Sequence, residues 1–188
     1  MPRTQPKRPH IPNFRRIARK ASQAANEILE SEVKAFALES RDGFREQIKL
    51  QNFDSFEIFP LTSKYLAKKR KSGADLRTMI ATQTYINSLK VRKIKQKGKR
   101  GVTRMLYYVG FHENDMAVDL KGNLTNTTLH TVAAAQEFGI IGKSLMWKLP
   151  PRKHWTPYYD HMRSYVAPTV RKNIQSLIIA RWKQLGIA

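Results

Sequence analysis

The sequence predicts an α+β fold, with long helices towards both ends of the chain and strands between them. Apolar residues recur at helical spacing over residues 14–36 and again over residues 162–185. Between them, residues 85–95 and 102–111 carry the alternating, β-branched and aromatic side chains that are typical of strands. The glycine-containing basic turn that joins these strands predicts a hairpin.

One domain accounts for most of the chain. The 188 residues are enough to bury a sizeable core, and the apolar fraction of 41% fits a folded globular protein. Residues 1–12 hold four prolines among basic side chains, which predicts an extended basic arm. Residues 13–188 are expected to form a single domain. Its first helix is expected to start at Asn13 as N-cap and to end or break at Gly43.

Caps and turn residues mark the shorter elements. Thr62 or Ser63 is expected to cap a helix that runs to Lys71, and Gly73 to end that helix in a left-handed conformation. A second short helix is expected over about residues 75–82.

Glycine and proline residues also mark the expected elements of the C-terminal third. Residues 119–123 are expected to form a turn, and residues 131–138 a helical turn that Gly139 closes. The Thr-Pro pair at 156–157 predicts the start of the last helix, because proline suits the first helical position. Pro168 is expected to kink or divide this helix.

The charge of the chain predicts an anionic partner. Lys and Arg total 35 against 14 Asp and Glu, which gives a net charge of +21. Nucleic acid, an acidic protein surface or a membrane surface normally offsets such a charge. The absence of cysteine excludes disulfides and cysteine-ligated metals. No apolar run approaches the roughly 18 residues of a membrane span, and no apolar stretch follows the basic N-terminus as in a secretory signal.

Two basic segments are the candidate contacts with that partner. Both are rich in Lys and Arg, and both are expected to be exposed: Arg3, Lys7, Arg8, Arg15 and Arg16 near the N-terminus, and Lys93, Lys95, Lys97, Lys99 and Arg100 in the hairpin. The alternatives are a solvated loop and a tail that only increases solubility. A third cluster, residues 68–71, is of a kind that often matches nucleic-acid patches by chance.

Catalysis has little support in the sequence. His112 and Glu113 with Asp115 are the one group of acid–base residues close together, and they lack the spacing of a metal site such as HxxxH. There is no GxSxG motif and no P-loop. We therefore expect no enzyme activity, no cofactor and no metal. A nuclease is the kind of enzyme that the chain would suit best.

Three segments form an ordered set along the chain. The first segment, residues 60–89, reads PLTSKYLAKKRKSG…LRTMIATQTYINSL; the second, residues 104–111, reads RMLYYVGF. The third begins with TVAAAQEFG at residue 131 and ends with LPPRKHWTP at residue 157. The residues that carry the third signature are Glu137, Phe138, Gly139, Pro150, Pro151, Arg152 and Trp155. In this order, the three segments resemble bacteriophage tail-completion and virion-morphogenesis proteins, which act in the neck or as tail terminators.

The resemblance implies a twisted antiparallel sheet packed by helices and assembled as a closed ring, for instance a hexamer. Such proteins cap the tail tube or seat it on the head–tail connector. The implied partners are further copies of the chain, the tail tube protein, connector or portal-adaptor proteins, and genomic DNA passing through the lumen, with no membrane. The implied location is the virion, and the host cytoplasm during assembly. Phe138 is expected to be buried beside the turn at Gly139, and Arg152 to form hydrogen bonds with carbonyls or a carboxylate.

An alternative from another class is a basic nucleic-acid-binding protein of the ribosomal or nucleoid type. The net charge of +21 motivates it. It predicts tight binding with a steep dependence on salt.

Overall fold

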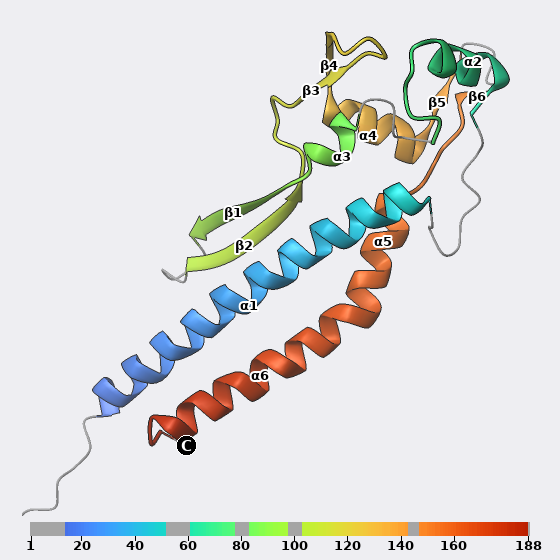
Figure 1. Cartoon of the computed structure of the whole chain (residues 1–188). Helices are drawn as coiled ribbons and strands as arrows, with labels where there is room; N and C mark the ends of the chain where they lie inside the picture. The colour runs from blue at the N-terminus through green and yellow to red at the C-terminus, as the bar shows by residue number, and fades with distance from the viewer. Residues whose placement is uncertain (1–13, 52–60, 78–82, 98–102, 143–146, 188) are drawn as a thin grey trace, which may run out of the picture.

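Two antiparallel helical segments run the length of the molecule; the β1–β2 hairpin lies along the middle of the first, and the other short elements gather at one end (Figure 1). The computed structural model describes residues 14–51, 61–77, 83–97, 103–142 and 147–187. The helices are α1 (Phe14–Leu50), α2 (Ser63–Lys71), α3 (Thr84–Asn87), α4 (Leu129–Phe138), α5 (Trp155–His161), the π-helical turn η2 (Met162–Val166) and α6 (Ala167–Gln184). The strands are β1 (Lys90–Lys97), β2 (Thr103–Gly110), β3 (Met116–Val118), β4 (Leu124–Thr128), β5 (Ile140–Ile141) and β6 (Trp147–Leu149).

The α+β class and the long helices at both ends are confirmed. The strands differ from the expectation, because the described residues form three separate antiparallel pairs, β1–β2, β3–β4 and β5–β6, instead of one sheet. The β1–β2 hairpin matches Lys90 with Gly110 and Lys97 with Thr103. Lys95 and Lys97 therefore belong to the strand, and the turn is shorter than the sequence suggested.

Helix α1 continues through Gly43, which was expected to end or interrupt it. A Cβ added at this glycine would lie 2.8 Å from the hydroxyl oxygen of Tyr158. That hydroxyl donates a hydrogen bond of 2.6 Å to the carbonyl oxygen of Ser40. Gly43 thus allows a tyrosine to approach the backbone of α1 closely, and it marks a helix contact rather than a helix end.

Two short elements also differ from the prediction. Residues 84–87 form the helical turn α3, where the sequence suggested a strand. Residues 75–77 are not helical; instead the Asp75 carboxylate accepts hydrogen bonds from the backbone and the guanidinium of Arg77. The rest of the second predicted helix, residues 78–82, lies outside the described residues, as does Asn13.

Several caps and turns agree with the prediction. The Thr62 hydroxyl accepts from the Tyr65 N–H to cap α2, and Gly73 and Gly139 have the positive φ angles expected after their helices. The predicted turn at 119–123 joins β3 to β4, since the Asp119 N–H donates to the Asn123 carbonyl. Near Pro168 the C-terminal helix changes to the π-helical turn η2, which divides α5 from α6 as predicted.

The core lies where the C-terminal end of α1 meets α3, α4 and the loop after β2. It consists of buried apolar side chains: Phe44, Ile48, Tyr85, Ile86, Leu89, Phe111, Ala117, Leu129 and Ala133. We call this end of the molecule the head. The other end is the helical stalk, made of residues 14–37 of α1 and α6, which buries only the small or aliphatic side chains of Ala24, Ala37 and Ile174. At its far end the Trp182 indole N–H donates to the Ala21 carbonyl at 3.1 Å.

Candidate functional site

A buried carboxylate joins the two parts of the third signature. Glu137 lies at the end of α4 and is 3% exposed. One of its oxygens, Oε2, accepts from the backbone N–H groups of His154 and Trp155 at 2.9 and 3.0 Å. The other, Oε1, accepts from the N–H of Thr156 at 3.0 Å. A single side chain thus satisfies three N–H groups at the start of α5, and this replaces the cap expected from Thr156.

This geometry favours the charged form of Glu137. Burial alone would raise the pKa of the carboxyl, but the hydrogen bonds from residues 154–156 outweigh burial and leave the pKa below its usual range. The positive end of the α5 dipole acts in the same direction. The carboxylate is therefore a fixed negative charge that holds α4 and α5 together.

His154 continues the network towards α3. Its imidazole is fully buried; Nδ1 lies 2.8 Å from the Arg152 carbonyl oxygen, and Nε2 lies 2.6 Å from the Tyr85 hydroxyl. Because a carbonyl only accepts, Nδ1 carries a proton in this arrangement, and it also lies 3.3 Å from Oε2 of Glu137. The Tyr85 oxygen in turn accepts from the Trp155 indole N–H at 3.0 Å. Every polar atom of this network has a partner inside the protein, so its role is to fix the arrangement of α3, α4 and α5.

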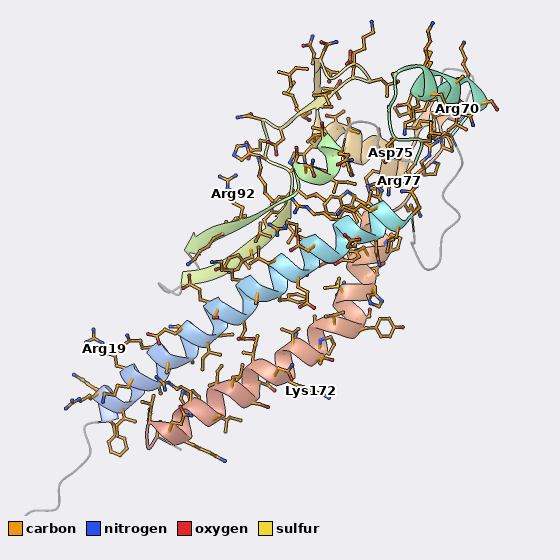
Figure 2. The ribbon with its side chains drawn as sticks, viewed as in Figure 1. Arg19, Arg70, Asp75, Arg77, Arg92 and Lys172 are labelled. Carbon is orange, nitrogen blue, oxygen red and sulfur yellow. The ribbon has the colours of Figure 1, made fainter. Side chains whose placement is uncertain are left out.

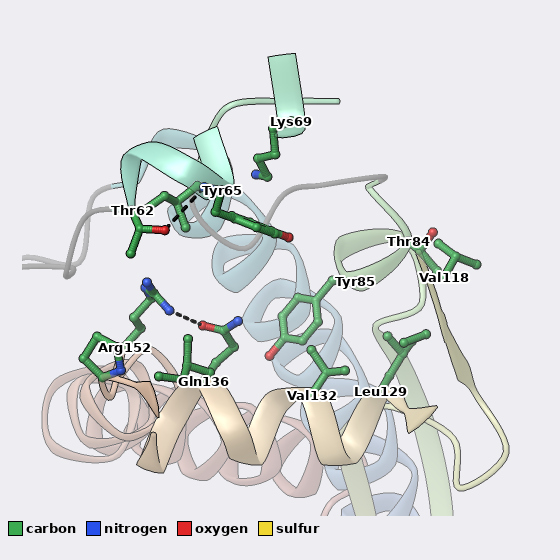
Figure 3. Close-up of a pocket in the computed structure, with 14 residues that line it drawn as sticks. Thr62, Tyr65, Lys69, Thr84, Tyr85, Val118, Leu129, Val132, Gln136 and Arg152 are labelled. Atoms are coloured by element: carbon green, nitrogen blue, oxygen red, sulfur yellow. Dashed lines mark hydrogen bonds between the residues drawn. The ribbon is translucent and has the colours of Figure 1, made fainter. Parts of the chain in front are cut away.

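A pocket of about 470 Å³ opens beside this network (Figure 3). Its walls come from α2, α3, α4 and the segment around Pro150, and two of its cationic side chains, Lys69 and Arg152, are 1% and 4% exposed. Lys69 Nζ donates to the Arg77 carbonyl at 2.6 Å, and Arg152 donates to the side-chain oxygen of Gln136 at 3.4 Å. Burial lowers the pKa of both cations. The pocket therefore combines an apolar floor with two positive charges, and none of the described residues that line it is acidic.

The residues suggested for acid–base chemistry form a turn. The Asp115 carboxylate accepts from the His112 backbone N–H at 2.7 Å and pairs with Lys90 at 3.1 Å, and Glu113 is exposed. Although burial opposes it, these hydrogen bonds lower the pKa of Asp115. Within the described ranges, no group of three or more His, Cys, Asp or Glu residues is arranged to hold a metal ion.

The exposed aromatic of the third signature contradicts the prediction. Phe138, expected to be buried beside Gly139, is 71% exposed. Ile140 and Ile141, which follow it in the chain, are 44% and 58% exposed. Glu137 faces inwards to α5, and the next residue of a helix lies about 100° further round the axis, which takes Phe138 off the buried face of α4.

The predicted basic contacts are scattered. Arg15 and Arg16 are exposed at the start of α1. Lys93, on β1, forms an ion pair with Glu30 of α1. Lys95 and Lys97 pair through their backbones with Met105 and Thr103. The remaining predicted contacts lie outside the described residues: Arg3, Lys7, Arg8, Lys99 and Arg100.

Of the signature residues, Glu137, Arg152 and Trp155 come together around α5, and Pro150 lines the pocket. Pro151 is half-buried beside Arg152. Sequence reasoning missed Tyr85, Lys69 and His154. Tyr85 was part of an expected strand, and a lysine in a run of four basic residues gave no sign that it alone would be buried.

Comparisons with models of protein families, with curated proteins and with solved structures find no match to this chain. Among the described helices, none has both the length and the apolar character needed to cross a membrane.

Proposed function

We propose that the chain is a structural subunit of a phage neck or tail junction, which forms a ring that completes the tail or joins it to the head connector. The ordered signature in the sequence points to this family. The contact between Glu137 and residues 154–156 supports treating the two halves of the third signature, residues 131–139 and 149–157, as one unit, because they meet at a buried carboxylate. In this proposal, residues 1–12 act as an extended arm towards neighbouring subunits.

The observation that carries an assembly role is the exposure of Phe138, Ile140 and Ile141 directly after the anchored Glu137. Adjacent large apolar side chains that face solvent, held on a rigid element, are typical of protein interfaces. A second copy of the chain is the occupant that we propose, because a ring repeats one heterologous contact until it closes.

The polar network supports a structural role over a catalytic one. Its His, Tyr and Glu side chains are buried, and they already bond to each other or to backbone groups. They serve to hold the interface segment in place while copies associate.

The test is the oligomeric state of purified protein alone and with its tail tube or connector, measured by light scattering and negative-stain imaging. We expect rings in the wild type, and Phe138→Ser to shift them towards monomer. Leu124→Ser is the matched control, since Leu124 is 76% exposed on β4, away from the signature. A chain that stays monomeric with both partners, or a control that dissociates as readily as Phe138→Ser, would contradict the proposal.

A further inference from the structure

The first and last segments of the sequence both contain basic residues and lack acidic ones. Residues 1–26 contain no Asp or Glu, and neither do residues 161–188. All six acidic residues of α1 lie at Glu27 or beyond. Five basic residues lie in the C-terminal stretch: Arg163, Arg171, Lys172, Arg181 and Lys183.

The fold brings these two acid-free segments together. The start of α1 and the end of α6 lie side by side at the far end of the helical stalk, joined by the bond from Trp182 to Ala21 (Figure 1). Figure 2 shows Arg19 projecting from α1 near this end, and Lys172 on the outer side of α6. The separation of charge in the sequence thus becomes a positively charged end on the molecule.

The cations at the start of α1 are unfavourable for the stability of that helix. The first turn of α1 has no acidic residue, and Arg15, Arg16, Arg19 and Lys20 all lie in its first two turns. Cations at the positive end of a helix dipole destabilise the helix, and the like charges at positions 15/19 and 16/20 repel each other at i,i+4 spacing. The charges at these four positions therefore oppose the dipole of α1 and repel each other, and an external polyanion would relieve both effects.

The exposed surface at the start of α1 is better suited to bind phosphate groups than to insert into a lipid membrane. All four cations are exposed, and Ser22 and Gln23 extend the polar face. Among the apolar residues of the same turns, Ala21 is half-buried and Ala24 is buried, whereas Phe14 is 73% exposed. An interfacial membrane helix needs a continuous apolar face to insert, and a single exposed phenylalanine beside four cations does not provide one.

We infer that the far end of the helical stalk binds the phosphate backbone of duplex DNA without reading its sequence. The contact cluster is Arg15, Arg16, Arg19 and Lys20, all exposed on the first two turns of α1. This inference goes beyond the assembly role and does not depend on it, since it rests on charge and exposure alone. Binding through phosphates releases counterions, which gives a dependence on salt that can be measured.

The experiment compares two quadruple variants that remove the same charge. The stalk variant is R15Q/R16Q/R19Q/K20Q. The control is K64Q/K68Q/R70Q/K71Q, which changes four exposed residues of α2 in the head. Glutamine keeps the helix propensity in both, and circular dichroism verifies that both fold. Binding to a short fluorescein-labelled DNA duplex is measured by anisotropy over a range of salt concentrations.

We expect the stalk variant to bind at least about tenfold more weakly. The slope of log K against log salt should become shallower by about 0.9 for each phosphate that the variant no longer neutralises. The control should keep most of the wild-type slope. Equal losses of affinity in the two variants would show a diffuse effect of net charge and overturn the inference, as would unchanged binding in the stalk variant. Stalk-dependent binding to vesicles of phosphatidylcholine and phosphatidylserine, with no binding to the duplex, would also overturn it.

The same samples are measured for oligomeric state. The stalk variant should assemble like the wild type, because its substitutions lie at the start of α1, at the opposite end of that helix from α4, the helix that Phe138 ends (Figure 1). Loss of duplex binding with assembly intact, or the reverse, separates this inference from the proposed function.

Discussion

At the scale of single residues, Glu137 has the largest structural effect for its size. A carboxylate that receives three backbone N–H groups combines a helix cap, a dipole contact and a link between α4 and α5. Its position shows that the EFG segment serves two purposes: the glutamate faces inwards and stabilises the head, while Phe138 faces outwards.

Glu137→Gln tests the charge at nearly constant shape. The amide can accept at one oxygen only, so its NH₂ group faces a backbone donor, and we expect a loss of about 2–4 kcal/mol in the free energy of unfolding. Urea unfolding at neutral pH measures it. Glu113→Gln is the control, because Glu113 is exposed on a turn, and it should change the free energy by less than about 0.5 kcal/mol.

Glu137 also predicts a dependence on pH. Since the fold lowers its pKa, the contribution to stability is complete above the ordinary glutamate pKa of about 4.3 and is lost as the pH falls towards the lower folded value. The wild type should therefore lose stability below about pH 4 more steeply than Glu137→Gln. If the free energy of unfolding falls equally steeply with decreasing pH in both proteins, the charge of Glu137 does not act as described.

Tyr85→Phe removes the hydroxyl that serves both His154 and Trp155. Two buried polar atoms then lose their partner, and we expect a cost of about 2–3 kcal/mol. Thermal unfolding measures it. Tyr159→Phe is the control, because Tyr159 is 64% exposed, and an equal loss in this variant would contradict the role of the network.

At the scale of elements, the sequence located the long helices well and the short ones poorly. Helical periodicity over many residues predicted α1 and α6, and the caps at Thr62, Gly73 and Gly139 were correct. The turn α3 was missed because four residues carry no period, and tertiary contacts of Tyr85 and Ile86 decide their conformation. The start of α5 was misplaced because its cap comes from Glu137, 17 residues away from His154.

Gly43→Ala tests how α1 meets α5. Alanine favours a helix by up to about 1 kcal/mol, but its Cβ collides with the Tyr158 hydroxyl at 2.8 Å. We expect a net loss of about 1 kcal/mol in the wild type, because Tyr158 must move and its bond to Ser40 breaks. In a Tyr158→Phe background the same change should be neutral or stabilising. A double-mutant cycle by urea unfolding checks this, and an equal effect in both backgrounds would contradict the contact.

At the scale of the whole molecule, the core lies at one end, and a cluster of cations in a segment without acidic residues lies at the other. The head holds most of the buried apolar side chains, whereas few are buried along the stalk. The sequence indicated the total charge, but its placement depends on the antiparallel return of α6, which composition does not encode. Of the residues singled out in the sequence, Glu137, Pro150, Arg152 and Trp155 lie at the candidate site, whereas the burial of Lys69 and His154 follows from packing between distant segments.

Stability should differ along the molecule accordingly. Amides at the far end of the stalk, in residues 14–24 and 177–187, should exchange with solvent faster than those of residues 40–50, because fewer buried contacts must break to expose them. Hydrogen–deuterium exchange with mass spectrometry measures both regions in one sample. Equal protection in the two regions would mean that the stalk is covered by something beyond the single chain.

The unbroken course of α1 also fixes a distance. Its 37 residues, at about 1.5 Å each, give a rod of roughly 55 Å that begins among exposed cations and ends in the packed head. The helix therefore fixes the distance between a ligand bound at its first turns and a partner bound at the head. Each residue adds about 1.5 Å of length and about 100° of rotation, so a change in the length of this helix alters the separation and the relative orientation of its two ends together.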